Sequence, residues 1–457
     1  MQQPSIVDRL DDAPGHLSGA GRLFCTGRVS SVSGLTAEID GLNGHLAIGD
    51  RISLLNRDDV PISAEIVAFR GGRARALTFG DLNGIGAGAP AKAQFGLNAS
   101  LASARLQVSD RWLGRVVDPL GAPLDGLGSL GAGTPRAVRA DPPNAARRAR
   151  LGARLSLGVR ALDLFATCRT GQRLGLFAGS GVGKSTLLSM LAQQADCDVI
   201  VLALVGERGR ELREFIEDDL GPEGLARSIV VVATSDQPPL MRREAAYAAM
   251  TVAEHFRDQG KSVLLLMDSV TRFCLALREI GLAAGEPPAT RGYPPSVFAE
   301  LPRLLERAGP GPDGPAAGQI TAIFTVLVEG DDHNEPVADA VRGILDGHVV
   351  LDRRIGEGGR YPAIDVLRSL SRTVPGCLEP GERAAVRQAR EILGTQAELS
   401  DLVRLGAYQP GADPAADEAL RLAPLIERLL TQQKDEPSTL ADSFGRLTEL
   451  LGDDHDA

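Results

Sequence analysis

The spacing of apolar and polar residues divides the chain into stretches of different character. Residues 1–20 are polar and acidic, and the near-helical spacing of their few apolar positions fits either a short partner-binding helix or a frayed terminus. Over residues 21–97, short runs of strand-forming residues are separated by Gly, Asp and Asn. Runs with this punctuation predict a small β-barrel.

A loop-rich stretch over 98–150 is followed by an alternation of strand-like and helix-like patterns. The strands that we expect are 173–177, 198–205, 228–235, 262–268, 318–329 and 347–352. The helices that we expect between them are 186–191, 210–220, 239–259, 271–281, 296–308 and 334–345. This alternation predicts an α/β domain with a mostly parallel, doubly wound sheet, whose ligands bind at the carboxyl ends of the strands.

The pattern becomes helical from about residue 381, where Leu and Ala recur on one face. The expected helices cover 381–395, 397–405, 414–433 and 437–451, with prolines marking two of the breaks. We therefore expect an N-terminal tail, a β-barrel domain, an α/β domain and a C-terminal helical domain. These cover residues 1–20, 21–97, 98–380 and 381–457.

The most informative motif is Ala178-Gly-Ser-Gly-Val-Gly-Lys-Ser185, between an expected strand and an expected helix. A phosphate-binding P-loop needs that context, because the glycines let successive N–H groups point at phosphate oxygens and the helix N-terminus adds a favourable dipole. The motif predicts that Lys184 contacts the β- and γ-phosphates and that the Ser185 hydroxyl binds Mg²⁺. The expected nucleotide-binding residues are Gly179, Ser180, Gly181, Val182, Gly183, Lys184, Ser185 and Thr186.

Two acidic residues stand at the ends of expected strands. Asp268 ends the apolar run 262–268, and Glu207 follows the run 198–205. A carboxylate at the tip of a buried strand is costly unless a cation meets it, and Mg²⁺ at this edge of the sheet is the obvious one. Alternatively, Asp268 caps the next helix and Glu207 is a solvated loop acid. Together with the P-loop, the two acids predict a nucleotide-hydrolysing core.

Composition narrows the class of protein. The 457 residues suffice for two or three domains, and 43% hydrophobic with 24% charged residues is ordinary for a soluble protein. A net charge of −10 argues against a general nucleic-acid-binding surface. The five cysteines have no CxxC spacing, and no apolar run approaches the roughly 18 residues of a membrane span. We therefore expect a cytoplasmic protein, at most peripheral on a membrane.

Further motifs point to one family. They are Gly206-Glu-Arg-Gly-Arg-Glu211, Met267-Asp-Ser-Val-Thr-Arg-Phe273, Ala289-Thr-Arg-Gly-Tyr-Pro-Pro-Ser-Val-Phe298, Glu329-Gly-Asp-Asp332, Asn334-Glu-Pro-Val-Ala-Asp-Ala340, Gly359-Arg-Tyr-Pro-Ala-Ile-Asp365 and Ser371-Arg372. On these motifs the chain resembles the rotary-type hexameric ATPases related to the catalytic subunit of ATP synthase. More narrowly, it resembles the ATPases of flagellar and injectisome type III protein export. The resemblance implies a RecA-like P-loop core between a β-barrel and C-terminal helices, with ATP and Mg²⁺ as cofactors.

The resemblance also implies roles for residues outside the P-loop. Glu207 corresponds to the carboxylate that orients the attacking water. Asp268 corresponds to an acid that reaches Mg²⁺ through a water molecule. Tyr361 matches the aromatic residue that packs on adenine, and ordinary loop packing is its alternative role.

Three arginines receive catalytic roles from the same resemblance. Arg208 and Arg272 correspond to arginines that hold the γ-phosphate, and surface ion pairs are the alternative for both. Arg372 matches an arginine finger that a neighbouring subunit supplies. If so, an isolated chain has an incomplete site, and its activity should rise with protein concentration.

The resemblance further implies partners and a place of action. We expect a homo-hexamer that works with a central stalk-like export protein and a stator-like ATPase regulator. The loop at 279–291 corresponds to one that faces the central channel. Chaperone–substrate complexes and the membrane proteins of the export gate are further expected partners, and nucleic acid is not one. The expected location is cytoplasmic, peripherally associated with the inner membrane at the flagellar export apparatus.

Four alternative functions share parts of this pattern. The run Ala289–Pro295 and the lack of an acidic run in the C-terminal helices disfavour a catalytic ATP synthase subunit. Glu207 disfavours a non-catalytic subunit, which has no need of a water-orienting acid. The acidic net charge, and the lack of interleaved basic and aromatic residues over 21–97, disfavour a ring-shaped RNA translocase. The injectisome ATPase shares nearly every motif and stays the alternative to a flagellar export ATPase.

Overall fold

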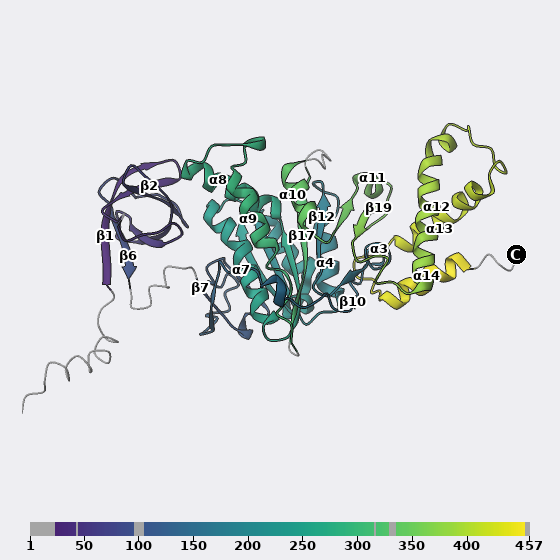
Figure 1. Ribbon diagram of the computed structural model, residues 1–457, viewed down its shortest axis with the longest axis horizontal. Coiled ribbons are helices and arrows are strands. Elements are labelled where there is room, and N and C mark those ends of the chain that lie inside the picture. Colours follow the sequence, from purple (N-terminus) through teal and green to yellow (C-terminus); the bar gives the residue numbers. More distant parts are fainter. Residues whose placement is uncertain (1–22, 43, 96–104, 315–316, 329–334, 453–457) are drawn as a thin grey trace, which may run out of the picture. The chain divides into compact units, whose positions relative to one another are not determined.

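The computed structural model describes residues 23–42, 44–95, 105–314, 317–328 and 335–452, and Figure 1 shows the chain coloured along its sequence. The chain divides into two compact units. One comprises Met1–Arg105 with Ala283–Gly285, and the other comprises the rest. The expected tail over 1–20 and the Glu329–Asp332 motif lie outside the described residues. The four-part domain division stays a prediction.

Six antiparallel strands close into a β-barrel in the order β1-β2-β5-β4-β3-β6. They are β1 (Leu23–Ser33), β2 (Thr36–Asp40), β3 (Arg51–Leu55), β4 (Pro61–Arg70), β5 (Arg73–Thr78) and β6 (Pro90–Phe95). Ile39, Leu54 and Ile66 are fully buried in the barrel core, because alternate residues of each strand point inward. The predicted barrel is confirmed, and its closure removes the unpaired strand edges of an open sheet.

The central sheet of the second unit has the order β19-β18-β12-β17-β15-β13-β14-β8, with β16 beside β17. Its strands are β8 (Arg115–Val117), β12 (Arg173–Ala178), β13 (Val199–Glu207), β14 (Ser228–Thr234), β15 (Ser262–Asp268), β16 (Gly309–Pro310), β17 (Gln319–Leu327), β18 (Gly347–Leu351) and β19 (Ile364–Ser371). The pairs β18–β19 and β16–β17 are antiparallel, and the other described pairs are parallel. The mostly parallel sheet is confirmed.

The stretch expected to be loop-rich holds three short strands. β8 pairs with Ile229–Val231 and extends the central sheet by one strand, whereas β7 (Arg105–Val108) and β9 (Thr134–Ala137) pair with each other. Strands of three or four residues are too short to produce a recognisable period in the sequence. Only the pairing with a neighbouring strand reveals them.

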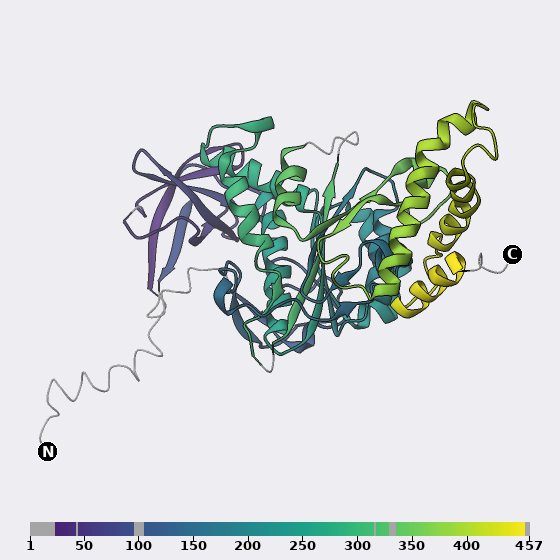
Figure 2. The same cartoon turned by 45° about the vertical axis from the view of Figure 1, so that its right-hand side comes forward.

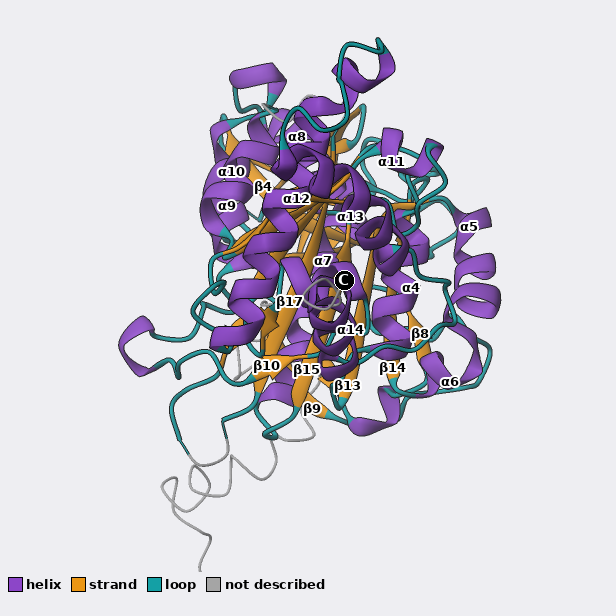
Figure 3. Ribbon diagram, turned by 90° about the vertical axis from the view of Figure 1, so that its right-hand side faces the viewer, coloured by secondary structure: helices purple, strands orange, loops and turns teal. Residues whose placement is uncertain are grey.

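Helices cover both faces of the sheet. Figure 3 shows the strands as a central layer, with α4 (Lys184–Gln194) on one side and α9 (Pro295–Leu305) and α10 (Pro336–Ile344) on the other. α7 (Pro239–Arg257) packs on β13, β14 and β15. All residues of β13 up to Gly206 are buried. Parallel strands that are covered on both faces read as continuous apolar runs, and the sequence pattern had this form.

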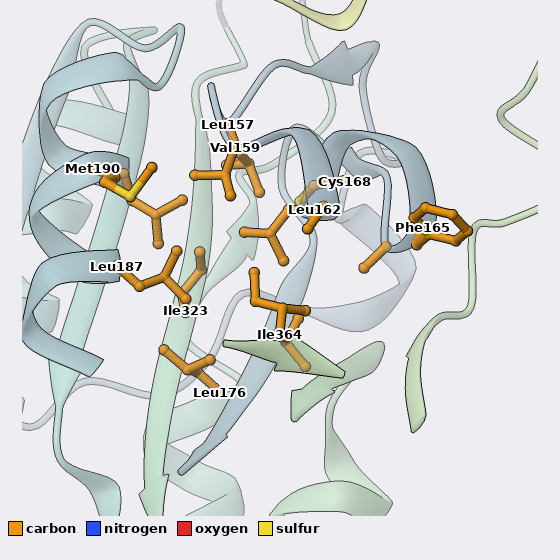
Figure 4. Close-up of a cluster of buried hydrophobic side chains, with 14 of the residues drawn as sticks. Leu157, Val159, Leu162, Phe165, Cys168, Leu176, Leu187, Met190, Ile323 and Ile364 are labelled. Atoms are coloured by element: carbon orange, nitrogen blue, oxygen red, sulfur yellow. The ribbon is translucent and has the colours of Figure 1, made fainter. Parts of the chain in front are cut away.

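A buried cluster fixes the helix that follows the P-loop. In Figure 4, Leu187 and Met190 of α4 lie near Leu176 of β12 and Ile323 of β17, and Leu162 belongs to α3 (Arg160–Phe165). None of these five residues is more than 4% exposed. Full burial of such a side chain contributes about 1.5–3 kcal/mol, so the first turn of α4 rests on a firmly packed helix.

Three C-terminal helices pack on one another, and Figure 2 draws them in yellow-green to yellow. They are α12 (Pro380–Arg404), α13 (Pro414–Leu430) and α14 (Leu440–Gly452). The separate helices expected at 381–395 and 397–405 were wrong, because α12 is continuous through Gly394. A glycine inside a helix costs only about 1 kcal/mol, which the packing of the buried Ala389 and Ile392 offsets. None of the helices in the described ranges has the length and hydropathy that a membrane crossing requires.

Candidate active site

The glycine-rich loop joins β12 to α4, in the strand–loop–helix order that the motif predicts. Gly181 and Gly183 have φ angles of 76° and 91°, which favour glycine because a Cβ would be strained there. Val182 is buried and anchors the loop, whereas Ser180, Ser185 and Thr186 are exposed. The loop therefore leaves the start of α4 open to a ligand.

Side chains from α4, β13 and β15 meet beside this loop. Lys184 Nζ forms an ion pair with Asp268 Oδ2 and lies 3.7 Å from Glu207 Oε1. The other Asp268 oxygen, Oδ1, accepts a 2.7 Å hydrogen bond from Thr325 on β17. Asp268 is only 4% exposed, yet both of its oxygens have partners, as the burial of a charge requires.

Arg272, on α8 (Val270–Ala284), completes the group around Glu207. Its Nε lies 3.3 Å from Glu207 Oε1, and its guanidinium also donates to the main-chain oxygen of Gly206. Burial and the neighbouring Asp268 carboxylate raise the pKa of Glu207, while the charges of Lys184 and Arg272 oppose the rise. A carboxylate with a raised pKa is a better proton acceptor than an ordinary glutamate.

A pocket of about 180 Å³ opens beside these side chains. Its lining is largely acidic and comprises Ser185, Leu204, Glu207, Glu211, Leu212, Glu214, Phe215, Asp219 and Asp268. A single helix was expected over 210–220. The structure has α5 (Gly209–Glu214), a π-helical turn over Phe215–Leu220 and α6 (Gly221–Ala226). The expected segment is thus helical throughout, and Phe215 and Asp219 of its π-helical turn line the pocket.

Tyr361 and Arg353 lie against the glycine-rich loop itself, at Gly183 and Ser180 respectively. A Cβ on Gly183 would lie 3.6 Å from two carbons of the Tyr361 ring, so the ring and the loop are neighbours. Tyr361 is 50% exposed, which leaves ring surface free for a ligand. Arg353, at the start of α11 (Arg353–Glu357), donates a 2.9 Å hydrogen bond to the main-chain oxygen of Ser180.

Two of the predicted site arginines lie apart from this group in the single chain. The Arg208 side chain, just before α5, is 70% exposed and pairs at 3.1 Å with Glu211 in the first turn of that helix. Arg372 is exposed just after β19, and within the described ranges its guanidinium has no hydrogen bond or ion pair. The structure thus brings together Lys184, Glu207, Asp268 and Arg272, but not these two.

The sequence reasoning missed two residues that support the site. Thr325, the partner of Asp268, is one of several polar residues in the expected strand 318–329, and the pattern alone does not say which of them meets Asp268. Arg353 had no signal in the sequence, because an arginine after a strand is common and its contact with Ser180 depends on a loop 173 residues earlier in the chain.

Two protein-family descriptions match the chain. Residues 158–371 match the ATP synthase alpha/beta family, nucleotide-binding domain, and residues 378–449 match the T3SS EscN ATPase C-terminal domain. The flagellum-specific ATP synthase of Caulobacter vibrioides is 54% identical over 429 residues, which cover 93% of this chain and 95% of that protein. The type 3 secretion system ATPase of Xanthomonas euvesicatoria is 45% identical over 428 residues, with 93% and 94% covered.

The chain is also similar to solved structures of a type III secretion ATPase. The assembled ATPase EscN from the enteropathogenic E. coli type III secretion system has a TM-score of 0.86 and 39% identity, with 93% of this chain and 100% of that chain covered. EscN in complex with its central stalk EscO has a TM-score of 0.83 and 38% identity, with the same shares covered.

Proposed function

The chain belongs to the family of flagellum-specific ATP synthases and type III secretion ATPases, and we infer that it hydrolyses ATP to energise flagellar type III protein export. The observation that carries the chemistry is the meeting of Lys184, Glu207 and Asp268 beside a P-loop. The flagellar system is preferred to the injectisome because the Caulobacter relative is more similar than the Xanthomonas relative.

Phosphoryl transfer depends on positioning and on stabilisation of charge. The backbone of residues 179–183 and the N-terminus of α4 bind the phosphates of ATP, and Lys184 neutralises the β- and γ-oxygens. Glu207 orients the attacking water and accepts its proton, which its raised pKa favours. Arg272 holds Glu207 in place through their 3.3 Å contact and is the arginine that would contact the γ-phosphate.

The residues around the pocket suit Mg²⁺. The exposed Ser185 hydroxyl and the Asp268 carboxylate line the same pocket, and both are the hard oxygen donors that Mg²⁺ prefers. Mg²⁺ commonly keeps several waters and is bound through one or two protein oxygens together with substrate phosphates. When bound, the cation neutralises charge on the β- and γ-phosphates. Ser185 would hold the cation directly, and Asp268 would hold it through water.

The remaining site residues contact the adenine base of ATP or lie at the contact between subunits. Tyr361 packs on adenine, since its half-exposed ring lies at the end of the P-loop. The chain forms a homo-hexamer in which Arg372 of one subunit completes the site of the next, and this accounts for its exposed position. Arg208 lies at the same contact between neighbouring subunits. A finger of this kind contributes on the order of 10³–10⁵ in rate.

Work from hydrolysis passes to partners of the export apparatus. A central stalk-like protein is the first, because EscN is known in complex with its central stalk EscO. A stator-like regulator, chaperone–substrate complexes and the export gate are the others, and the site of action is the cytoplasmic face of the inner membrane. These follow from the family to which the chain belongs.

The experiment that tests the function combines hydrolysis with secretion. Purified protein with Glu207→Gln should bind ATP but hydrolyse it roughly 10²–10⁴-fold more slowly, because the general base is lost. A deletion strain should regain secretion of flagellin and hook protein with the wild-type gene and not with Glu207→Gln. Glu217→Gln, an exposed glutamate paired with Arg213, is the matched control and should restore secretion fully.

Each other result has a defined meaning. Full rescue by Glu207→Gln would contradict either the role of Glu207 or the need for hydrolysis. Intact motility in the deletion strain, with loss of another secreted set of proteins, would assign the chain to an injectisome.

A further inference from the structure

The loop that carries Tyr361 is bound by residues of the C-terminal helical region. The main-chain N–H of Gln432, just after α13, donates a 2.9 Å hydrogen bond to the main-chain oxygen of Tyr361. The preceding Arg360 forms an ion pair with Glu427 of α13, with Nε and Oε2 2.5 Å apart. Two successive residues of the loop thus have their partners at the end of one helix.

Arg360 joins the loop to α13 from a buried position. Its side chain is 8% exposed, whereas that of Glu427 is 43% exposed. The Arg360 guanidinium also donates to the main-chain oxygens of Pro362 and Ile364, at 3.3 Å and 2.7 Å. It therefore ties together both sides of Tyr361, and Glu427 supplies its counter-charge.

The turn after α13 is itself fixed to the nucleotide-binding core. Gln432 is only 3% exposed. Its side-chain oxygen accepts a 2.9 Å hydrogen bond from the Arg160 main-chain N–H, and its side-chain nitrogen donates a 2.8 Å hydrogen bond to the main-chain oxygen of Gly158. The Arg160 guanidinium donates to the main-chain oxygens of Leu429 and Thr431, at 2.7 Å and 2.6 Å. The end of α13 is thus a defined support and not a loose neighbour.

We propose that Glu427 and Gln432 position Tyr361 against the P-loop, so that the C-terminal helices set the affinity for the base of the nucleotide but not for its phosphates. The proposal rests on the proposed packing of Tyr361 on adenine. Glu427 is a positioning residue, because it acts through Arg360. A shift of α13 changes the support of Tyr361 and leaves Lys184, Glu207 and Asp268 with their own partners on α4, β13 and β15.

Steady-state kinetics separate base contacts from phosphate contacts. For Glu427→Ala, the KM for ATP should rise roughly five- to tenfold with kcat within twofold, because one charge-assisted contact is lost. Inhibition by inorganic tripolyphosphate, which has no base, should be unchanged. Glu427→Gln keeps an oxygen acceptor for Arg360 and should give a smaller rise. Glu418→Ala, an exposed glutamate of the same helix, is the matched control and should behave as wild type.

Tyr361→Ala distinguishes failure of this proposal from failure of the proposed base contact. If Tyr361→Ala leaves the KM for ATP unchanged, the role of Tyr361 is wrong. If Tyr361→Ala raises the KM and Glu427→Ala does not, the support from α13 is wrong. A parallel loss of tripolyphosphate inhibition in Glu427→Ala would also overturn the proposal, because it would mean a general loss of structure. Thermal unfolding of each variant checks that loss directly.

Discussion

Glu207 is surrounded by groups that act on its charge in opposite directions. Burial and Asp268 disfavour its ionised form, and Lys184 and Arg272 favour it, with a raised pKa as the net result. The proposed role needs the ionised carboxylate. Activity is therefore present above the pKa of Glu207 and is lost as the pH falls through it.

We expect this titration to appear in the pH dependence of hydrolysis. The acidic limb of kcat/KM for ATP should lie above pH 4.5, the ordinary pKa of a glutamate, because the pKa of Glu207 is raised. The measurement is kcat/KM between pH 4.5 and 8 for the wild type and for the residual activity of Glu207→Gln. Persistence of the same limb in Glu207→Gln would assign it to another group.

The start of α12 depends on one glutamate for two contacts. Glu382 Oε2 accepts the main-chain N–H of Glu379 at 2.8 Å, as part of a capping box, and pairs with Arg154 at 2.6 Å. The first contact stabilises the element itself, and the second joins it to β10 (Arg154–Leu155). The helix therefore begins at a point that is also its attachment to the core.

Substitution of Glu382 separates these two contributions. Glu382→Ala should lower the free energy of unfolding by about 1–2 kcal/mol, because both contacts are lost. Glu382→Gln should lower it by roughly half as much, since an amide oxygen still caps Glu379. Denaturant unfolding of the three proteins is the measurement. Glu391→Ala, which removes only an exposed pair with Arg387, is the control, and an equal loss in that variant would contradict the argument.

At the scale of the whole molecule, the exposed Arg372 has its proposed partner on another subunit. Hydrolysis per chain should then rise with protein concentration, because dilution separates Arg372 from the neighbouring P-loop. Arg372→Ala should lower kcat on the order of 10³-fold and leave ATP binding to the single chain intact.

Mixing two inactive variants tests the shared site. Lys184→Ala lacks the phosphate-binding lysine but keeps Arg372, and Arg372→Ala has the reverse defect. In mixed rings some boundaries pair an intact P-loop with an intact Arg372, so partial activity should return. Equal mixing at a concentration that supports assembly, followed by an ATPase assay, is the measurement. No recovery, in rings that demonstrably contain both variants, would place Arg372 outside the neighbouring site.

Local patterns were sufficient for the framework of the molecule. The barrel, the mostly parallel sheet and the P-loop follow from short-range periodicity and from glycine spacing, which act over a few residues and are visible in the sequence. Glu207 and Asp268 could be selected because each stands at a strand end. The roles assigned to them, and to Tyr361 and Arg372, came from the resemblance and stay predictions.

Contacts between distant segments depended on the order of the strands and on helix packing. Thr325 supports Asp268 only because β17 lies beside β15, and Glu427 reaches Arg360 only because α13 ends beside the Tyr361 loop. The continuity of α12 likewise reflects packing, which outweighs the weak preference of a single glycine. A period along the chain reports which face of an element is buried, but not which element covers it. The P-loop and the two strand-end acids could therefore be selected from the sequence, whereas the residues that contact them from other elements could not.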